Sequence, residues 1–264
     1  MRSSDGQAVV DRAFRVLSAF SPRRPDMTLD DLVARTGLAR STVHRLATQL
    51  EGQGALHRSA RGWRLGVRLF ELGQMVPREQ RLRELALAHM EDLYEATHET
   101  VHLAVLDAGE VLYVEILSGH RKVPTPSRRG GRMPVHCTGV GKALLAFSDD
   151  GGRGLLASST PLARFTPQTI TDPDRLLREL HDVRRTGLAY DREEARAGLI
   201  CVAAPIVTAG GTAEAALSVS MPADGPLTLA EATPALRTAA RALMRELNVN
   251  GRRPDTIAAL APGE

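Results

Sequence analysis

A compact group of cationic and short polar side chains lies close to residue 40. Around it, apolar residues recur at spacings of three and four, which predicts a helix with these polar groups on its outer face. Guanidinium, imidazole and hydroxyl groups held together in this way can hydrogen-bond the base edges and phosphates of duplex DNA. The members of the group are Arg40, Ser41, Thr42, His44 and Arg45.

The elements that must position this group form a predicted helix-turn-helix with a β-wing over residues 28–65. Gly37 stands at the tight turn between the two helices, where a residue that tolerates positive φ is needed. Residues 56–58 and 63–65 are predicted as two short strands around a turn. The wing adds three arginines to the predicted DNA contacts: Arg58, Arg61 and Arg64.

The charge distribution supports a nucleic-acid partner. Residues 1–77 contain 12 arginines, no lysine and 7 acidic residues, a balance of +5, whereas the rest of the chain has a balance of −2. Positive charge gathered around a helix-turn-helix is typical of phosphate binding. A helical hairpin within a core, with an ordinary solvated face, would not require it.

A second group of reactive side chains follows from the register of a predicted hairpin. Two apolar strands flank the glycine pair at 210–211, a strong hairpin signal. If the pair forms the turn, Cys201 lies opposite Ser220 and Ala203 opposite Ser218, and all four side chains share one face. A thiol and two hydroxyls among small residues indicate a ligand cavity. A half-exposed sheet with both serines in solvent is an equally open interpretation.

A helix is predicted over 140–147, with one glycine just before it at 139 and another in its first turn at 141. Backbone N–H groups at a helix start with little side-chain cover favour an anion. A small carboxylate held by these amides and by the hairpin hydroxyls would fit a pocket that is otherwise apolar.

Three other patterns suggest enzyme chemistry. Residues 98–102 match H-E-x-x-H, but the preceding helix is predicted to end near Thr97, and two histidines on a strand would lie about 13 Å apart, too far for one metal ion. Residues 139–143 resemble a phosphate loop without its required glycine and hydroxyl. Cys201 with His136 could form a nucleophile and base, although a cysteine in an apolar strand is more often buried filler. We expect no metal, no cofactor and no enzymatic activity.

Length and composition indicate two domains in a reducing compartment. The chain has 264 residues and two cysteines, too few for a disulfide framework. No apolar run reaches the roughly 20 residues of a membrane span, and no signal core is visible near Met1, so a cytoplasmic location without membrane contact is expected.

We expect four segments along the chain. Residues 1–77 form a winged helix-turn-helix DNA-binding domain, and residues 78–97 form a linker helix, with a core helix of the second domain as an equal alternative. Residues 98–249 form an α+β effector-binding and oligomerisation domain, because strands, hairpins and covering helices alternate there. Residues 250–264 form a flexible tail.

The sequence resembles the IclR family of bacterial transcriptional regulators over about residues 8–248. The end of the family signature differs, because Val207 and Thr208 stand where an aromatic residue or His followed by Asp or Asn is usual. The resemblance rests in the first domain on Gly37-Leu38, Ser41-Thr42-Val43 and Arg45-Leu46, and in the second on Pro134-Val135-His136, Gly139, Gly141-Lys142-Ala143-Leu144-Leu145-Ala146, Gly187, Asp191, Glu194, Cys201-Val202-Ala203, Pro205 and Ile206.

The resemblance implies a winged helix-turn-helix joined by a linker helix to a GAF/PAS-like α+β domain with an antiparallel sheet. It implies homodimers or dimers of dimers (homotetramers) on palindromic operators, and effectors that are small organic acids, some of them aromatic. The implied effector contacts are Gly139 and Val140 through their backbone amides, Asp191, Cys201, Ser218 and Ser220.

Together these observations predict a ligand-responsive transcriptional regulator, which acts as a repressor or an activator depending on where its operator lies relative to the promoter. The alternatives are a thiol- or metal-dependent hydrolase and a constitutive DNA-binding dimer without an effector.

Overall fold

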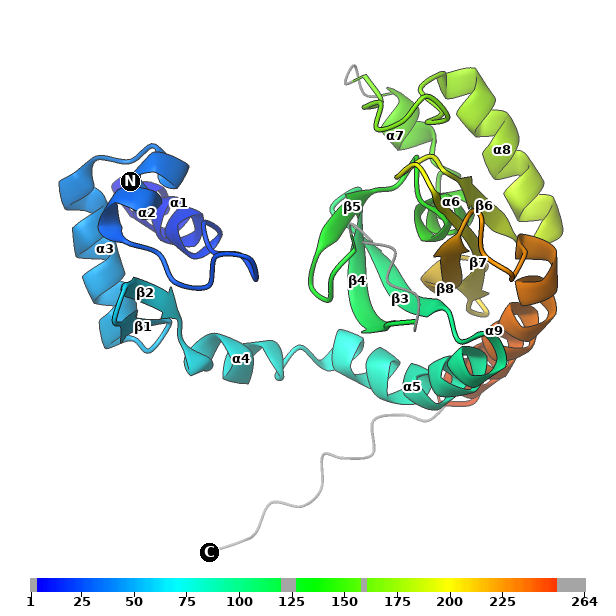
Figure 1. Cartoon of the computed structure of the whole chain (residues 1–264), viewed down its shortest axis with the longest axis horizontal. Helices are drawn as coiled ribbons and strands as arrows, with labels where there is room; N and C mark the ends of the chain where they lie inside the picture. Colours follow the sequence, from blue (N-terminus) through cyan, green and yellow to red (C-terminus); the bar gives the residue numbers. More distant parts are fainter. Residues whose placement is uncertain (1–3, 120–126, 158–160, 251–264) are drawn as a thin grey trace, which may run out of the picture. The chain divides into compact units, whose positions relative to one another are not determined.

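A computed structural model describes residues 4–119, 127–157 and 161–250, and the chain divides after Gln80 into two compact units (Figure 1). Of the predicted tail, 250–264, all but Asn250 lies outside the described residues. Within the described ranges, no helix is long and apolar enough to cross a membrane.

The first unit has the helix-turn-helix and wing that the sequence predicts. A capping box begins its second helix, where Thr28 Oγ1 accepts from the Asp31 amide while Asp31 accepts from the Thr28 amide. Gly37 ends that helix with φ 66°, and its amide donates to the Val33 carbonyl. The elements are α1 (Ser4–Leu17), α2 (Leu29–Thr36), α3 (Arg40–Gly52), β1 (Leu56–Ser59), β2 (Gly62–Leu65) and α4 (Val67–Gly73).

A buried cluster holds the wing against the helices. Trp63 of β2 is buried with Leu32 of α2 and with Val43 and Leu46 of α3. The backbone of Trp63 also pairs with that of Met27 through two hydrogen bonds of 2.8 and 2.9 Å. The polar face of α3 is therefore presented from a unit with a core of its own.

The second unit is a six-stranded antiparallel sheet in the order β5-β4-β3-β8-β7-β6 (Figure 1). This arrangement agrees with the predicted α+β class. Its elements are α5 (Pro77–Thr97), β3 (Thr100–Asp107), β4 (Glu110–Leu117), β5 (Arg132–Pro134), α6 (Gly139–Ala146), α7 (Arg153–Ala157), α8 (Pro173–Thr186), β6 (Ala189–Arg192), β7 (Leu199–Val207), β8 (Ala213–Pro222) and α9 (Leu229–Asn250).

Helices cover both faces of the sheet, because alternate residues of each strand point to opposite sides. On one side, Val101, Leu217 and Val202 pack in a cluster with buried residues of α5 and α9. On the other side, Ala104, Ala216 and Ala203 pack with buried residues of α6 and α8. The small residues on this second face leave room for the site described below.

The helix predicted as a linker over 78–97 also contributes to this core. Leu82, Ala86, Met90 and Leu93 of α5 are buried in the cluster beneath the sheet. Through this apolar stripe, most of α5 belongs to the core of the second unit, which begins at Arg81.

Candidate functional site

The register of β7 and β8 brings the predicted hydroxyls and thiol together. Cys201 pairs with Ser220 and Ala203 with Ser218, which confirms the predicted pairing. The turn itself differs from a simple two-glycine turn, because Thr208 and Gly211 make the closing hydrogen bonds and the register shifts by one between Ile206 and Val207. This bulge restores the pairing that a two-residue turn would have given.

Two further strands extend the same row of side chains. Asp191 of β6 pairs with Cys201, and His102 of β3 pairs with Ser218. Because these residues share a face, the sheet presents a carboxyl, a thiol, two hydroxyls and an imidazole beneath α6. In the sequence, His102 stood out only as part of the H-E-x-x-H pattern, and nothing there indicated that it lies beside Ser218.

One cavity is bordered by all six residues predicted to contact an effector. Its volume is about 20 Å³, which is room for about one water molecule, so an effector would fit only if the lining side chains move apart. Its lining consists of the predicted Gly139, Val140, Asp191, Cys201, Ser218 and Ser220, and of His102, Tyr113, Ser127, Met133, Thr138, Ala195 and Leu199, which the sequence analysis did not identify.

The start of α6 lies directly against the sheet. A Cβ atom built on Gly139 would lie 2.9 Å from Cys201 Sγ, so only glycine permits this approach. Thr138 caps the helix, since its Oγ1 accepts from the Gly141 amide at 3.2 Å. Helix geometry leaves the amides of Gly139 and Val140 without an intrahelical acceptor, at the end of the helix that attracts anions.

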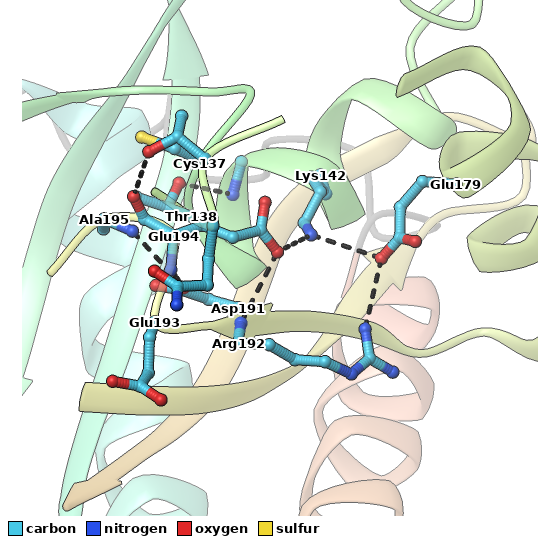
Figure 2. A network of polar contacts seen from close by, with 12 residues as sticks. Cys137, Thr138, Lys142, Glu179, Asp191, Arg192, Glu193, Glu194 and Ala195 are labelled. Atoms are coloured by element: carbon cyan, nitrogen blue, oxygen red, sulfur yellow. Dashed lines mark hydrogen bonds and ion pairs between the residues drawn. The ribbon is translucent and has the colours of Figure 1, made fainter. Parts of the chain in front are cut away.

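A buried polar network holds Asp191 beside this helix start (Figure 2). Asp191 Oδ1 accepts from the backbone amides of Glu194 at 2.6 Å and Ala195 at 3.4 Å. Lys142, fully buried on α6, donates to Glu194 at 2.6 Å and to Glu179 of α8 at 3.2 Å. The network ties the turn after β6 to α6 and α8.

Burial sets the protonation states in the cavity. It raises the pKa of Asp191 to about 7, although the amide of Glu194 opposes this shift. It raises the pKa of Cys201 to about 12 and lowers that of His102 to about 4. Near neutral pH the cavity therefore contains an uncharged imidazole, a protonated thiol and a carboxyl group that is partly protonated.

The arrangement does not support the hydrolase alternatives. His136 Nε2 lies 2.9 Å from the Ala163 carbonyl oxygen, and burial raises the pKa of the Cys201 thiol to about 12, so the thiol stays protonated. Helix α5 ends at Thr97, so His98 and His102 do not share a helical face. In the described part of the chain, no group of three His, Cys, Asp or Glu side chains is arranged to hold a metal ion.

The first unit exposes most of the predicted DNA contacts. On α3, Arg40, Ser41, His44 and Arg45 are exposed and Thr42 is half-buried. Arg45 forms no ion pair with any described residue, whereas Arg40 is paired with Asp30.

The three wing arginines are exposed, but two of them have partners within the first unit. Arg58 lies 3.9 Å above the Trp63 ring, and Arg64 lies 2.9 Å from Asp26. Arg58 is also paired with Glu51 at 3.6 Å, so among the described residues only Arg61 of these three has no ion pair.

Family models match both units. Residues 9–60 match the IclR helix-turn-helix domain, and residues 74–246 match the C-terminal domain of bacterial IclR transcriptional regulators. The chain belongs to the IclR family. Its family relatives are transcriptional regulators rather than enzymes, and this IclR chain is a ligand-responsive DNA-binding regulator.

Individual relatives agree with this assignment over most of their length. The chain is 32% identical to the HTH-type transcriptional regulator XynR of Escherichia coli K12, over 80% of this chain and 84% of the relative. It is 34% identical to BhcR of Paracoccus denitrificans, over 83% and 79%. A crystal structure of an IclR homolog complexed with 4-hydroxybenzoate from Microbacterium hydrocarbonoxydans has a TM-score of 0.83 and 35% identity, covering 91% of this chain and 99% of the other.

Proposed function

We propose that this IclR regulator binds a small organic acid in the cavity beneath α6, with the acid's carboxylate at the amides of Gly139 and Val140. The observation that carries the proposal is that all six residues named from the sequence line one cavity. Asp191, Cys201, Ser218 and Ser220 supply the remaining polar contacts. An aromatic acid is the favoured class, since a related structure contains 4-hydroxybenzoate.

The proposed DNA contacts are the polar face of α3 and the wing. Arg45 is the strongest candidate for a base contact, because it is exposed and has no ion pair among the described residues. The complete set is Arg40, Ser41, Thr42, His44, Arg45, Arg58, Arg61 and Arg64. On this proposal residues 1–77 read a palindromic operator in the cytoplasm, and the domain 98–249 senses the acid.

A homodimer, or a dimer of dimers, would follow from apolar surface on the first unit. Val67 and Phe70 of α4 are 71% and 66% exposed, and Met75 just beyond the helix is 63% exposed. Large apolar side chains that are exposed this close together mark an interaction surface. A second copy of the chain would also supply the second helix-turn-helix that a palindrome requires.

The effector shifts the regulator between two states only as far as its affinities for those states differ. We propose repression as the mode, released when the acid binds. Two curated relatives are named as repressors, IclR and AllR of Escherichia coli.

The test combines thermal shift with a gel shift at fixed salt. A panel of small organic acids, including 4-hydroxybenzoate, should raise the melting temperature and change the retardation of the promoter fragment. Ser220→Ala should weaken both responses, and its effector-free gel shift reports whether the variant is folded. If DNA binding is normal but no acid alters it, the chain is a constitutive DNA-binding protein and the proposal is wrong.

A further inference from the structure

His102 lies at the end of the cavity away from the start of α6. Gly139 is positioned over β7, next to Cys201 and Ala203, whereas His102 is on β3. The sheet order places β8 between these strands, so two strand spacings, about 10 Å, separate the two ends. A ligand with its carboxylate at the Gly139 amide can reach His102 if it is the length of one ring or a short chain.

The ring nitrogens of His102 are surrounded by hydroxyl groups. Nε2 lies 2.8 Å from Ser127 Oγ, and Nδ1 lies 3.4 Å from Ser218 Oγ and 3.5 Å from Ser220 Oγ. The last two distances are at the long limit for hydrogen bonds, so these groups are only weakly satisfied by one another. A ligand hydroxyl or carbonyl beside them would complete their hydrogen bonding.

This end of the cavity is polar but uncharged. Burial lowers the pKa of His102 to about 4, so its ring offers one N–H donor and one acceptor at neutral pH. The Tyr113 ring packs against it at 5.2 Å between centroids, and Met133 adds apolar surface. Among the described lining residues here, none has a formal charge that would pair with a second carboxylate or an ammonium group.

We propose that His102 is a specificity-determining residue, which with Ser218 and Ser220 recognises a neutral hydroxyl or carbonyl group at the end of the effector opposite its carboxylate. The proposal rests on the proposed function, because it assumes that the carboxylate lies at the Gly139 amide. It narrows the effector class to monocarboxylic acids with a distal hydrogen-bonding group. A diacid and an acid without such a group should both be poorer ligands.

The test measures binding of matched acids to the full-length chain by calorimetry. The pairs are 4-hydroxybenzoate with benzoate and 4-hydroxyphenylacetate with phenylacetate, each differing by one hydroxyl, and terephthalate serves as the diacid. Because one satisfied hydrogen bond in a buried site changes binding by about tenfold, the wild type should prefer at least one hydroxylated acid by about that factor. Terephthalate should bind more weakly than the preferred acid.

Two substitutions separate recognition from structure. His102→Leu should abolish the hydroxyl preference, so that both members of a pair bind with about the same affinity. His102→Gln, which keeps a neutral donor and acceptor, should retain part of the preference. If His102→Leu lowers the affinities for both members of a pair equally, His102 is only structural and the proposal is overturned.

A measurement on the wild type covers the case in which the variants fail to fold. With ¹⁵N-labelled histidine, the ring signals of His102 should shift when the preferred hydroxylated acid binds and not when its unsubstituted partner binds. Equal wild-type affinity within every pair overturns the role of His102 and leaves the acid site intact. Failure of all five acids to bind overturns both this proposal and the proposed acid site.

Discussion

Lys142 and Glu194 form a buried ion pair with 2.6 Å between Nζ and Oε1, and the backbone amide of Glu194 donates to Asp191 of the cavity. Both side chains are almost wholly inaccessible, and Glu179 completes the pairing of Lys142 at 3.2 Å. The second oxygen of Glu194 is buried without a hydrogen-bond partner in the described residues. The cost of burying the charge of Glu194 is therefore offset mostly by Lys142.

Replacing Lys142 by methionine should destabilise the second unit by about 3–5 kcal/mol, because the carboxylate of Glu194 would remain buried without its cation. The double variant K142M/E194Q should recover part of this loss, since residue 194 then carries no charge. Urea unfolding measures both effects. Arg185→Ala is the matched control, because its pair with Asp182 is exposed and should be worth less than about 1 kcal/mol.

Asp191 and His102 should make opposite contributions to the pH dependence of stability. With its pKa raised from 3.8 to about 7, Asp191 keeps a proton in the folded state that the unfolded chain loses, so stability falls as pH rises from about 4 to 7. With its pKa lowered from 6.5 to about 4, His102 stays neutral while the unfolded chain binds a proton. Its contribution to stability therefore rises between about pH 4 and 6.5.

Single variants should expose these two slopes. Between pH 4.5 and 6.5, the free energy of unfolding of Asp191→Asn should rise relative to wild type, by up to about 1.4 kcal/mol per pH unit. That of His102→Gln should fall over the same range, by up to a similar amount. Urea titrations at three pH values measure this, and profiles parallel to wild type would show that neither group has the shifted pKa.

The part of the site that depends on contacts between neighbouring segments could be predicted from the sequence. The glycine pair at 210–211 indicates the hairpin, and Cys201 pairs with Ser220 as predicted because the bulge after Ile206 offsets the longer turn. His102 could not be found in this way, because it is 116 positions from Ser218 and no turn joins β3 to β8. The network around Lys142 was missed for the same reason, since it joins α6, α8 and the turn after β6 only in the folded chain.

Exposed arginines on α3 should differ from arginines elsewhere in their effect on DNA binding. Arg45→Ala should reduce operator affinity by about 1–3 kcal/mol if the side chain makes a bidentate base contact. If it contacts a phosphate instead, affinity should fall evenly for all DNA sequences. The slope of log affinity against log salt concentration should then become shallower by about one. Arg178→Ala on α8 removes the same charge from an exposed position in the second unit, and it should leave the gel shift unchanged.

Gly139 should be intolerant of even one added methyl group. In Gly139→Ala the new Cβ would lie 2.9 Å from Cys201 Sγ, so the start of α6 must move away from the sheet and its amides would leave the carboxylate site. We expect effector affinity to fall at least about tenfold, the equivalent of one lost hydrogen bond in a buried site.

The second substitution Cys201→Ala tests this cause, because it removes the sulfur that the new methyl group would meet. The contact that remains, 3.3 Å to Ala203 Cβ, is tight but requires a much smaller shift. Calorimetry should therefore show that adding Gly139→Ala to Cys201→Ala lowers effector affinity less than adding it to the wild type does. Additive losses would mean that the sulfur is not the obstacle, and that glycine is needed at the helix start for another reason.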